Sequence, residues 1–123
     1  KPVYNHGAEL EFDLISSQDF YLTIFYFNDN EASLLFPNPL EESKVFNAEK
    51  IHNFPYDARY KLITEKKEET NRLIFVFTKE DYKFITKNPE RLSSRDEIFE
   101  WIYSISPDRR TTNGFSFTIL KNN

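Results

Sequence analysis

Three acidic residues spaced two apart are the first candidates for chemistry in this 123-residue chain. Glu9, Glu11 and Asp13 alternate with apolar residues, so a strand would place all three carboxylates on one face. Paired carboxylates carry out glycoside hydrolysis, but a catalytic acid needs a raised pKa, which comes from burial or from a close like charge. On the polar face of a first strand the three acids are more simply solvated, and they discourage edge pairing. We therefore assign no catalytic residue among them.

Metal ligands are scarce. The absence of cysteine excludes disulfides, thiolate nucleophiles and sites with cysteine ligands, and the only histidines are His6 and His52. The segment 28–31, Asn-Asp-Asn-Glu, has oxygen ligands of the kind that calcium prefers, but it lacks the spacing and the glycine of an EF-hand. Four polar residues between two strands are also what an ordinary hairpin shows.

Motifs for nucleophilic and phosphate chemistry are also missing. The chain has no Gly-x-Ser-x-Gly elbow, and its two glycines are too few for a glycine-rich phosphate loop. A Ser–His–Asp set could still assemble from distant positions, although only two histidines are available for it. We predict a protein that is not an enzyme and that uses no metal and no cofactor.

Aromatic side chains offer an alternative to catalysis, because exposed tryptophan and tyrosine rings form platforms for sugars and peptides. Trp101 lies on the apolar stripe of a predicted helix and is expected in the core. Four tyrosines fall where exposure is plausible: Tyr4, Tyr56, Tyr82 and Tyr103. They form no recognisable pattern, so the binding residues stay unknown. Two charge-mixed loops, 40–44 and 65–71, are expected to contact solvent or to form the polar rim of a protein interface.

Charge and hydropathy argue against two further classes of partner. The net charge is −4, the isoelectric point is near 5.2, and no basic cluster stands out, so we expect no nucleic acid. No stretch approaches the ~20 apolar residues of a membrane span, and we find no signal peptide. Because the chain starts at Lys1 and has no methionine, we interpret it as a fragment or a processed chain of a larger protein.

Most of the elements that position these residues are predicted to be strands. Residues 8–15 alternate between apolar and acidic side chains, which is the period of a strand with one wet face. Residues 20–27 and 72–78 are apolar on both faces, as expected for central strands that are covered on both sides. Residues 33–36 follow a polar turn, so 20–36 is predicted to be a hairpin.

A short motif ends this hairpin abruptly. Pro37 has no N–H and cannot continue an interior ladder, and Pro39 favours an extended or turn conformation at Asn38. The Asn38 side chain can bond nearby backbone groups. We therefore predict a core strand that leaves the sheet at a sharp corner. The residues with this structural role are Leu34, Leu35, Phe36, Pro37 and Asn38.

The middle of the chain continues the β pattern. Residues 51–55 are predicted to be a short edge strand, and 58–65 alternate like a further strand. Residues 66–71 are predicted to be a charged turn that leads into the strand 72–78, which is apolar on both faces. Residues 79–85 could make one or two helical turns.

The C-terminal part contains the one clear helix. Ser93 with Asp96 and Ser94 with Glu97 each match a capping box, and the apolar stripe runs from Ile98 to Ile105 until Pro107 stops it. The helix is predicted over about 94–106 within the segment 93–106. A last strand over about 114–120, with alternation in 115–120, is predicted to close the sheet.

The order of these blocks resembles the bacterial domain of unknown function, family 4384. The matching stretches are LEFDLISSQDFYLTIFYFNDNEASLLFPN (10–38), AEKIHNFP (48–55) and RLIFVFT (72–78), within a family-like region of about 8–85. The resemblance implies a β-rich, sandwich-like domain of envelope or secreted bacterial proteins, where it accompanies lipoprotein, outer-membrane-associated or peptidase-like domains. No catalytic motif belongs to the family. The implied location is periplasmic, outer-membrane-associated or secreted.

We therefore expect a mainly β, antiparallel β-sandwich-like domain over residues 1–123, with one packed helix in the C-terminal half and a final strand. The expected function is a non-catalytic protein-interaction or structural module that binds another protein or a neighbouring domain through a sheet edge or loop surface. A glycan- or peptide-binding module is the alternative, and it requires a concave site lined by two or three exposed aromatic rings. An enzyme would require a buried carboxylate or histidine with a perturbed pKa in a cleft.

Overall fold

The computed structural model describes residues 2–57, 59–86 and 92–121. Its strands are β1 (Val3–Asn5), β2 (Glu9–Leu10), β3 (Phe12–Leu14), β4 (Tyr21–Phe27), β5 (Ala32–Phe36), β6 (His52–Phe54), β7 (Tyr60–Lys61), β8 (Glu68–Thr78), β9 (Leu92–Ser93) and β10 (Arg110–Leu120). A helix, α1 (Arg95–Ser104), and a 3-10 turn, η1 (Pro107–Arg109), lie between β9 and β10. No helix in these ranges is long and apolar enough to cross a lipid bilayer.

Six strands form one large sheet in the order β1-β10-β8-β4-β5-β9. Its neighbours pair antiparallel, except that β1 runs parallel to β10. Strands β4 and β8 lie in the middle of this order, and both carry buried side chains on both faces. The prediction of two central, doubly apolar strands is confirmed, and so is the hairpin of β4 and β5.

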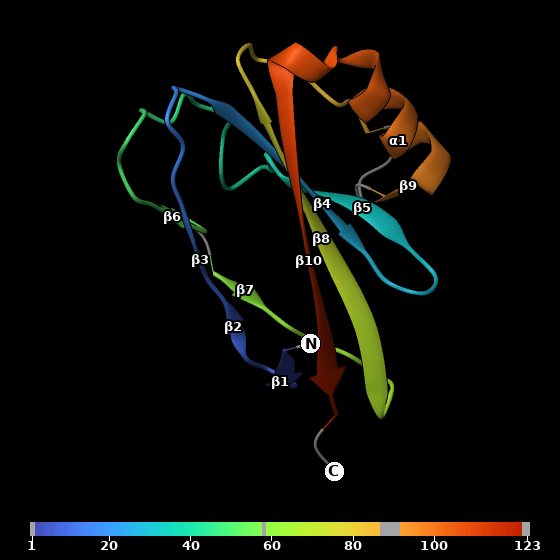
Figure 1. Cartoon of the computed structure of the whole chain (residues 1–123). Coiled ribbons are helices and arrows are strands. Elements are labelled where there is room, and N and C mark those ends of the chain that lie inside the picture. Colours follow the sequence, from blue (N-terminus) through green and yellow to red (C-terminus); the bar gives the residue numbers. More distant parts are fainter. Residues whose placement is uncertain (1, 58, 87–91, 122–123) are drawn as a thin grey trace.

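The large sheet is covered on both faces. Two short ladders, β2 with β7 and β3 with β6, lie over one face, and α1 lies over the other. In Figure 1, β10 runs down the centre of the view, with the ladder strands on one side and α1 on the opposite side. The fold is therefore β-sandwich-like with one packed helix and a final strand, as the sequence predicts.

Alternation along β4 and β8 fills two separate cores. Toward the ladders the sheet contributes residues such as Leu22, Ile24, Leu73 and Phe75. Toward α1 the contributing residues include Phe25, Phe27, Ile74 and Val76, which meet Ile98 and Ile102 of the helix. Burying both faces explains why β4 and residues 73–77 of β8 are apolar at nearly every position, since each side chain removes apolar surface from water.

The predicted corner lies at the end of β5. Ile24 pairs with Phe36 and Phe25 pairs with Leu34, so Leu35 is an extra residue that forms a β-bulge. The Asn38 amide donates to the Leu35 carbonyl at 2.9 Å, and its side-chain oxygen accepts the N–H groups of Leu40 and Glu41, each at 2.9 Å. The chain therefore leaves the sheet through an asparagine-stabilised turn, as the sequence predicts.

Helix α1 begins where one of the two capping boxes placed it. The Ser94 hydroxyl accepts the N–H of Glu97 at 3.1 Å and lies 3.2 Å from the Glu97 carboxylate, whereas Ser93 belongs to β9. The apolar stripe is confirmed, because Ile98, Ile102 and Ile105 are all buried. Trp101 is partly buried, with its ring centroid 5.6 Å from that of Phe25. The helix ends at Ser104, two residues earlier than predicted.

Three predicted elements differ from the structure. Residues 79–85 form no helix; they run irregularly, and Phe84 packs edge-on against Phe25 and Trp101. The predicted turn 66–71 is too long, because β8 already begins at Glu68. The last strand is also longer than predicted and begins at Arg110. In both extensions polar residues carry the strand, so no apolar alternation marks them.

The N-terminal half holds smaller corrections. The predicted strand 8–15 is divided at Glu11 into β2 and β3, and each half pairs with a different partner. Of the predicted strand 58–65 only β7 pairs, and residue 58 lies outside the described residues. The alternation there is correct nevertheless, since Leu62 and Thr64 are buried and Ile63 is 64% exposed. Ahead of them, β1 adds a parallel edge strand that the sequence did not indicate.

Candidate functional site

The three acidic candidates lie together on the ladder layer, and all three are exposed. Arg59 Nη1 lies 2.8 Å from Glu9 Oε2 and 3.8 Å from Glu11 Oε1. With Asp13 and Asp57 these residues line an open depression of about 340 Å³. Solvent screens such exposed ion pairs. The arrangement gives a hydrated acidic surface and lacks the buried carboxylate that the enzyme hypothesis requires.

The histidines make structural contacts. His6 Nδ1 accepts the N–H of Thr64 at 3.1 Å, and His52 Nε2 lies 2.8 Å from the Asn47 carbonyl. The segment 28–31 forms the β4–β5 turn, where the Asn28 side chain accepts the N–H groups of Asn30 and Glu31 at 3.0 and 2.7 Å. Within the described ranges no three histidine or acidic side chains are arranged to hold a metal ion.

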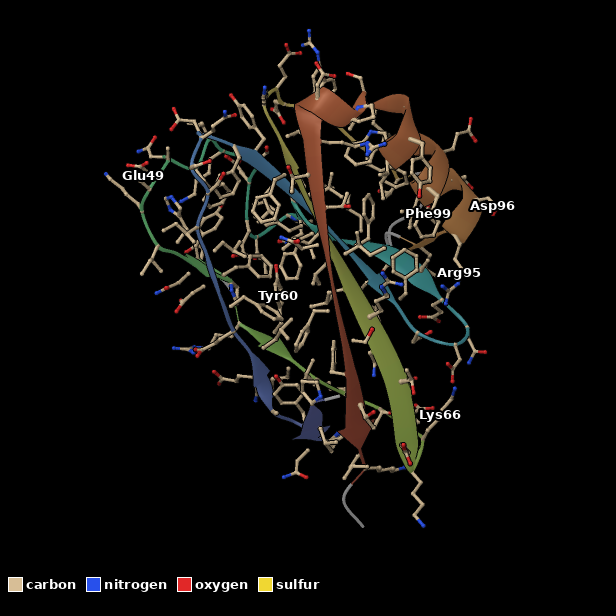
Figure 2. All side chains as sticks on the ribbon, viewed as in Figure 1. Glu49, Tyr60, Lys66, Arg95, Asp96 and Phe99 are labelled. Atoms are coloured by element: carbon tan, nitrogen blue, oxygen red, sulfur yellow. The ribbon has the colours of Figure 1, made fainter. Side chains whose placement is uncertain are left out.

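A buried carboxylate lies behind the Leu34–Asn38 motif, at a position where the sequence predicted a solvent-exposed loop. Glu41 has no exposed surface. Its Oε2 accepts the backbone N–H groups of Tyr56 at 2.7 Å and Asp57 at 3.1 Å, and its Oε1 accepts the Tyr60 hydroxyl. Figure 2 shows Tyr60 in the space between β7 and the large sheet. The network ties the corner to the ladder layer, so the role it supports is structural.

The four candidate tyrosines do not converge on one site. Tyr4 packs edge-on against Phe117, and Tyr56 lies beneath the Lys44 ammonium, which is 4.0 Å from its ring centroid. Burial, and then the charge of the nearby Glu41 carboxylate, raises the pKa of the Tyr56 hydroxyl. Tyr103 is 69% exposed and stacks on Phe99.

Tyr82 lines a groove of about 550 Å³. Phe84, Pro37 and Asn38 contribute to its walls, together with polar side chains that include Ser43 and Asp81. The Ser43 hydroxyl and an Asp81 carboxylate oxygen are 3.1 Å apart. The groove thus brings three residues of the corner motif, Leu34, Pro37 and Asn38, beside two aromatic rings.

The open edge of β10 is the largest unpaired backbone surface that the described residues present. β10 pairs with β8 over all of its residues, from Arg110 to Leu120, but β1 covers its outer side only from Thr118 to Leu120. Within the described chain, residues 110–117 therefore have no strand on the outer side. We call residues 110–117 the open edge. In Figure 1 this strand is at the front of the sheet.

The direction of the backbone groups along the open edge follows from two hydrogen bonds to the N-terminal segment. The Thr118 N–H donates to the Pro2 carbonyl at 2.9 Å, and the Leu120 carbonyl accepts the N–H of His6 at 2.8 Å. Backbone groups of alternate residues point to the same side of a strand. The N–H and C=O groups of Thr112, Gly114 and Ser116 therefore point outward, away from β8. The predicted last strand began only at about residue 114, so most of this surface was not predicted.

Comparison with known proteins gives one match. The sequence model of the family described as "Domain of unknown function (DUF4384)" matches residues 3–81, well over half of the chain. No curated protein and no solved structure matches. The matched segment begins at β1 and ends just after β8, so α1 and the open edge lie beyond it. The corner motif and the acidic residues lie inside it, in the order that the sequence resemblance indicated. The chain belongs to the family of domains of unknown function DUF4384.

Proposed function

We propose that this chain is a non-catalytic protein-interaction module that binds an extended segment of another protein, or of a neighbouring domain, by strand addition to the open edge. The observation that carries the proposal is the row of outward backbone groups at Thr112, Gly114 and Ser116. An added strand would satisfy each of these N–H and C=O groups with a main-chain hydrogen bond.

The composition of the open edge supports this use. Proteins commonly protect an exposed edge with prolines, lysines, inward charges, bulges or a very short strand. The open edge reads Arg-Thr-Thr-Asn-Gly-Phe-Ser-Phe and contains no proline, lysine or acidic residue. Its register with β8 is continuous, without a bulge. An edge of this length and composition is suited to pairing with another strand.

The wider setting of the module is part of the proposal. We infer a bacterial envelope-associated or secreted parent protein, in which the module accompanies other domains as a non-catalytic partner. This part of the proposal rests on analogy with the family that the sequence resembles.

Site-specific photo-crosslinking in the full-length parent protein tests the proposal. A benzophenone amino acid is placed at Thr112 or Ser116 and, as a matched exposed control in the ladder layer, at Ile51. We expect a discrete crosslinked product from both edge positions and none from position 51. Thr112→Pro removes one outward N–H and should abolish the product formed at Ser116. Identical products from all three positions, or products unaffected by Thr112→Pro, would contradict strand addition.

Hydrogen exchange of the resulting complex gives a second, independent test. The amides of Thr112, Gly114 and Ser116 should become protected when the partner binds. The amides of Asn113 and Phe115 face β8 and should be protected already in the free protein. Uniform protection of the whole strand, or protection elsewhere alone, would show that the partner binds in another way.

The groove lined by Tyr82 and Phe84 supports a second candidate function, the binding of a glycan or peptide. Its volume of about 550 Å³ and its two partly exposed rings support this candidate. Binding on a glycan array or to peptidoglycan, lost in Tyr82→Ala and kept in Tyr103→Ala, would establish this function. Absence of binding in the unmodified protein would remove it.

A further inference from the structure

An arginine side chain crosses β10 at the middle of the open edge. A Cβ atom on Gly114 would lie 2.9 Å from Arg72 Nη2 and 3.3 Å from Arg72 Nε, so the guanidinium group lies directly over the glycine. Arg72 is on β8, opposite Ser116, and it points to the same face as Ile74 and Val76, the face that α1 covers further along. Figure 1 shows β8 and β10 extending well past the helix, which leaves this part of the face uncovered.

Arg72 has no acidic partner within the described residues. The ion pairs formed there use Arg59, Lys66 and Arg109, and no hydrogen bond from the exposed Arg72 side chain is present. Arg110, also near the edge, lies over the Tyr103 ring and donates from Nε to the Ile105 carbonyl. Arg72 is thus a positive charge beside the open edge, in a chain whose net charge is −4.

Because residue 114 is a glycine, no side chain at this position separates the Arg72 guanidinium from the open edge. A strand added beside β10 would lie about 4.8 Å away, and a side chain opposite Gly114 on the Arg72 face would stand next to the guanidinium. An arginine guanidinium donates two parallel N–H···O bonds to a carboxylate. The charge and the planar shape of the group both favour an acidic residue at this position of the partner.

We propose that the segment added to the open edge carries an aspartate or glutamate opposite Gly114, which pairs with Arg72. This inference rests on the proposed strand addition and names the partner's chemistry. A second copy of the chain is a poor occupant: two β10 edges paired about Gly114 would bring their Arg72 guanidinium groups together, and like charges repel across a sheet.

Three synthetic peptides test the inference. Each is a blocked nine-residue chain of alternating threonine and valine, with glutamate, glutamine or lysine at the centre, and its affinity is measured by fluorescence anisotropy. The unmodified protein should bind the glutamate peptide about fivefold more tightly than the glutamine peptide, a ratio typical of a solvent-exposed ion pair. The lysine peptide should bind most weakly. The glutamate preference should shrink as salt is added.

Variants assign the preference to one side chain. Arg72→Gln should abolish the preference for glutamate while leaving the affinity for the glutamine peptide unchanged, and Arg72→Lys should keep part of it. Arg59→Gln, which removes an ion-paired arginine on the ladder layer, should leave the preference intact. Equal binding of all three peptides by the unmodified protein overturns the acidic partner but leaves strand addition standing. Failure of all three peptides to bind overturns both.

Discussion

At the scale of single residues, the side chain with the most structural consequence is Glu41. Its carboxylate is fully buried and accepts the N–H groups of Tyr56 and Asp57. Glu41→Ala removes the carboxylate that accepts both N–H groups and leaves a cavity in place of a fully buried side chain, so we expect it to lower the free energy of unfolding by about 2–4 kcal/mol. Urea denaturation followed by tryptophan fluorescence measures the change.

The neighbouring glutamate is the matched control. Glu42 is exposed, and only its backbone carbonyl is used, accepting the Tyr56 hydroxyl at 2.5 Å. Glu42→Ala should therefore change the free energy of unfolding by no more than about 0.5 kcal/mol. Equal effects of the two substitutions would show that the Glu41 network does not hold the corner.

A second residue-scale prediction concerns alkaline pH. Burial, and then the charge of Glu69, raises the pKa of Tyr26 to about 12 from its ordinary value of 10.0. Because the folded state holds this proton more tightly than the unfolded state, its stabilisation is complete below pH 10 and is lost as the pH rises toward 12. The loss is on the order of 2 kcal/mol. It should appear as a fall in the unfolding free energy that is smaller by this amount in Tyr26→Phe.

At the scale of elements, the alternating direction of the N–H groups along β10 predicts where a proline is tolerated in this strand. The N–H of Thr112 points away from β8, whereas the N–H of Asn113 points toward β8, where Asn113 is opposite Phe75. Asn113→Pro removes a ladder hydrogen bond and should cost about 3 kcal/mol of unfolding free energy. Thr112→Pro should cost about 1 kcal/mol or less. Similar costs for the two variants in thermal or urea unfolding would mean that the open edge is not open.

The elements also show how far sequence alone reaches. Runs that are apolar on both faces predicted β4 and the buried part of β8, and a polar turn predicted the hairpin with β5. The capping box predicted the start of α1. These signals reflect contacts made within or beside the element itself. The first residues of β8, 68–71, were not predicted as strand, because the buried side chains there, Glu69 and Asn71, are polar. Asn71 is satisfied by the Tyr26 hydroxyl and the Glu69 carbonyl, and such partners are invisible from local sequence.

The candidate site was missed for a related reason. Residues 110–114 of β10 are mostly exposed polar residues with no alternation, so nothing local distinguishes them from a loop. Their strand conformation depends on β8, more than thirty positions earlier in the chain. Glu41 was likewise assigned to solvent, because only the folded corner brings Tyr56 and Tyr60 to it. Both the start of β10 and the burial of Glu41 depend on contacts between residues far apart in the chain. The periodicity and composition of a local segment do not encode such contacts.

At the scale of the whole molecule, the large sheet lies between two covering layers, the short ladders on one face and α1 on the other. The ladder-side core draws on β1 to β8 and on Phe117 and Ile119 of β10, while the opposite core is completed by Ile98 and Ile102 of α1. The family match ends at residue 81, before either α1 or β10 begins. The matched segment therefore contains the central strands β4 and β8. It lacks α1, which covers one face of these strands, and β10, which pairs with β8.

This division predicts how a shortened chain behaves. A chain of residues 1–86 contains the whole family match, yet it exposes Phe25, Phe27 and Val76 to water and leaves β8 unpaired along the side that β10 occupies. Exposed apolar faces and long free edges favour association over folding. We expect this chain to show no cooperative thermal unfolding by circular dichroism and poor amide dispersion by NMR, whereas residues 1–123 show both. A cooperative transition and a dispersed spectrum for residues 1–86 would instead establish the family segment as a domain in its own right, with α1 and the open edge as additions to it.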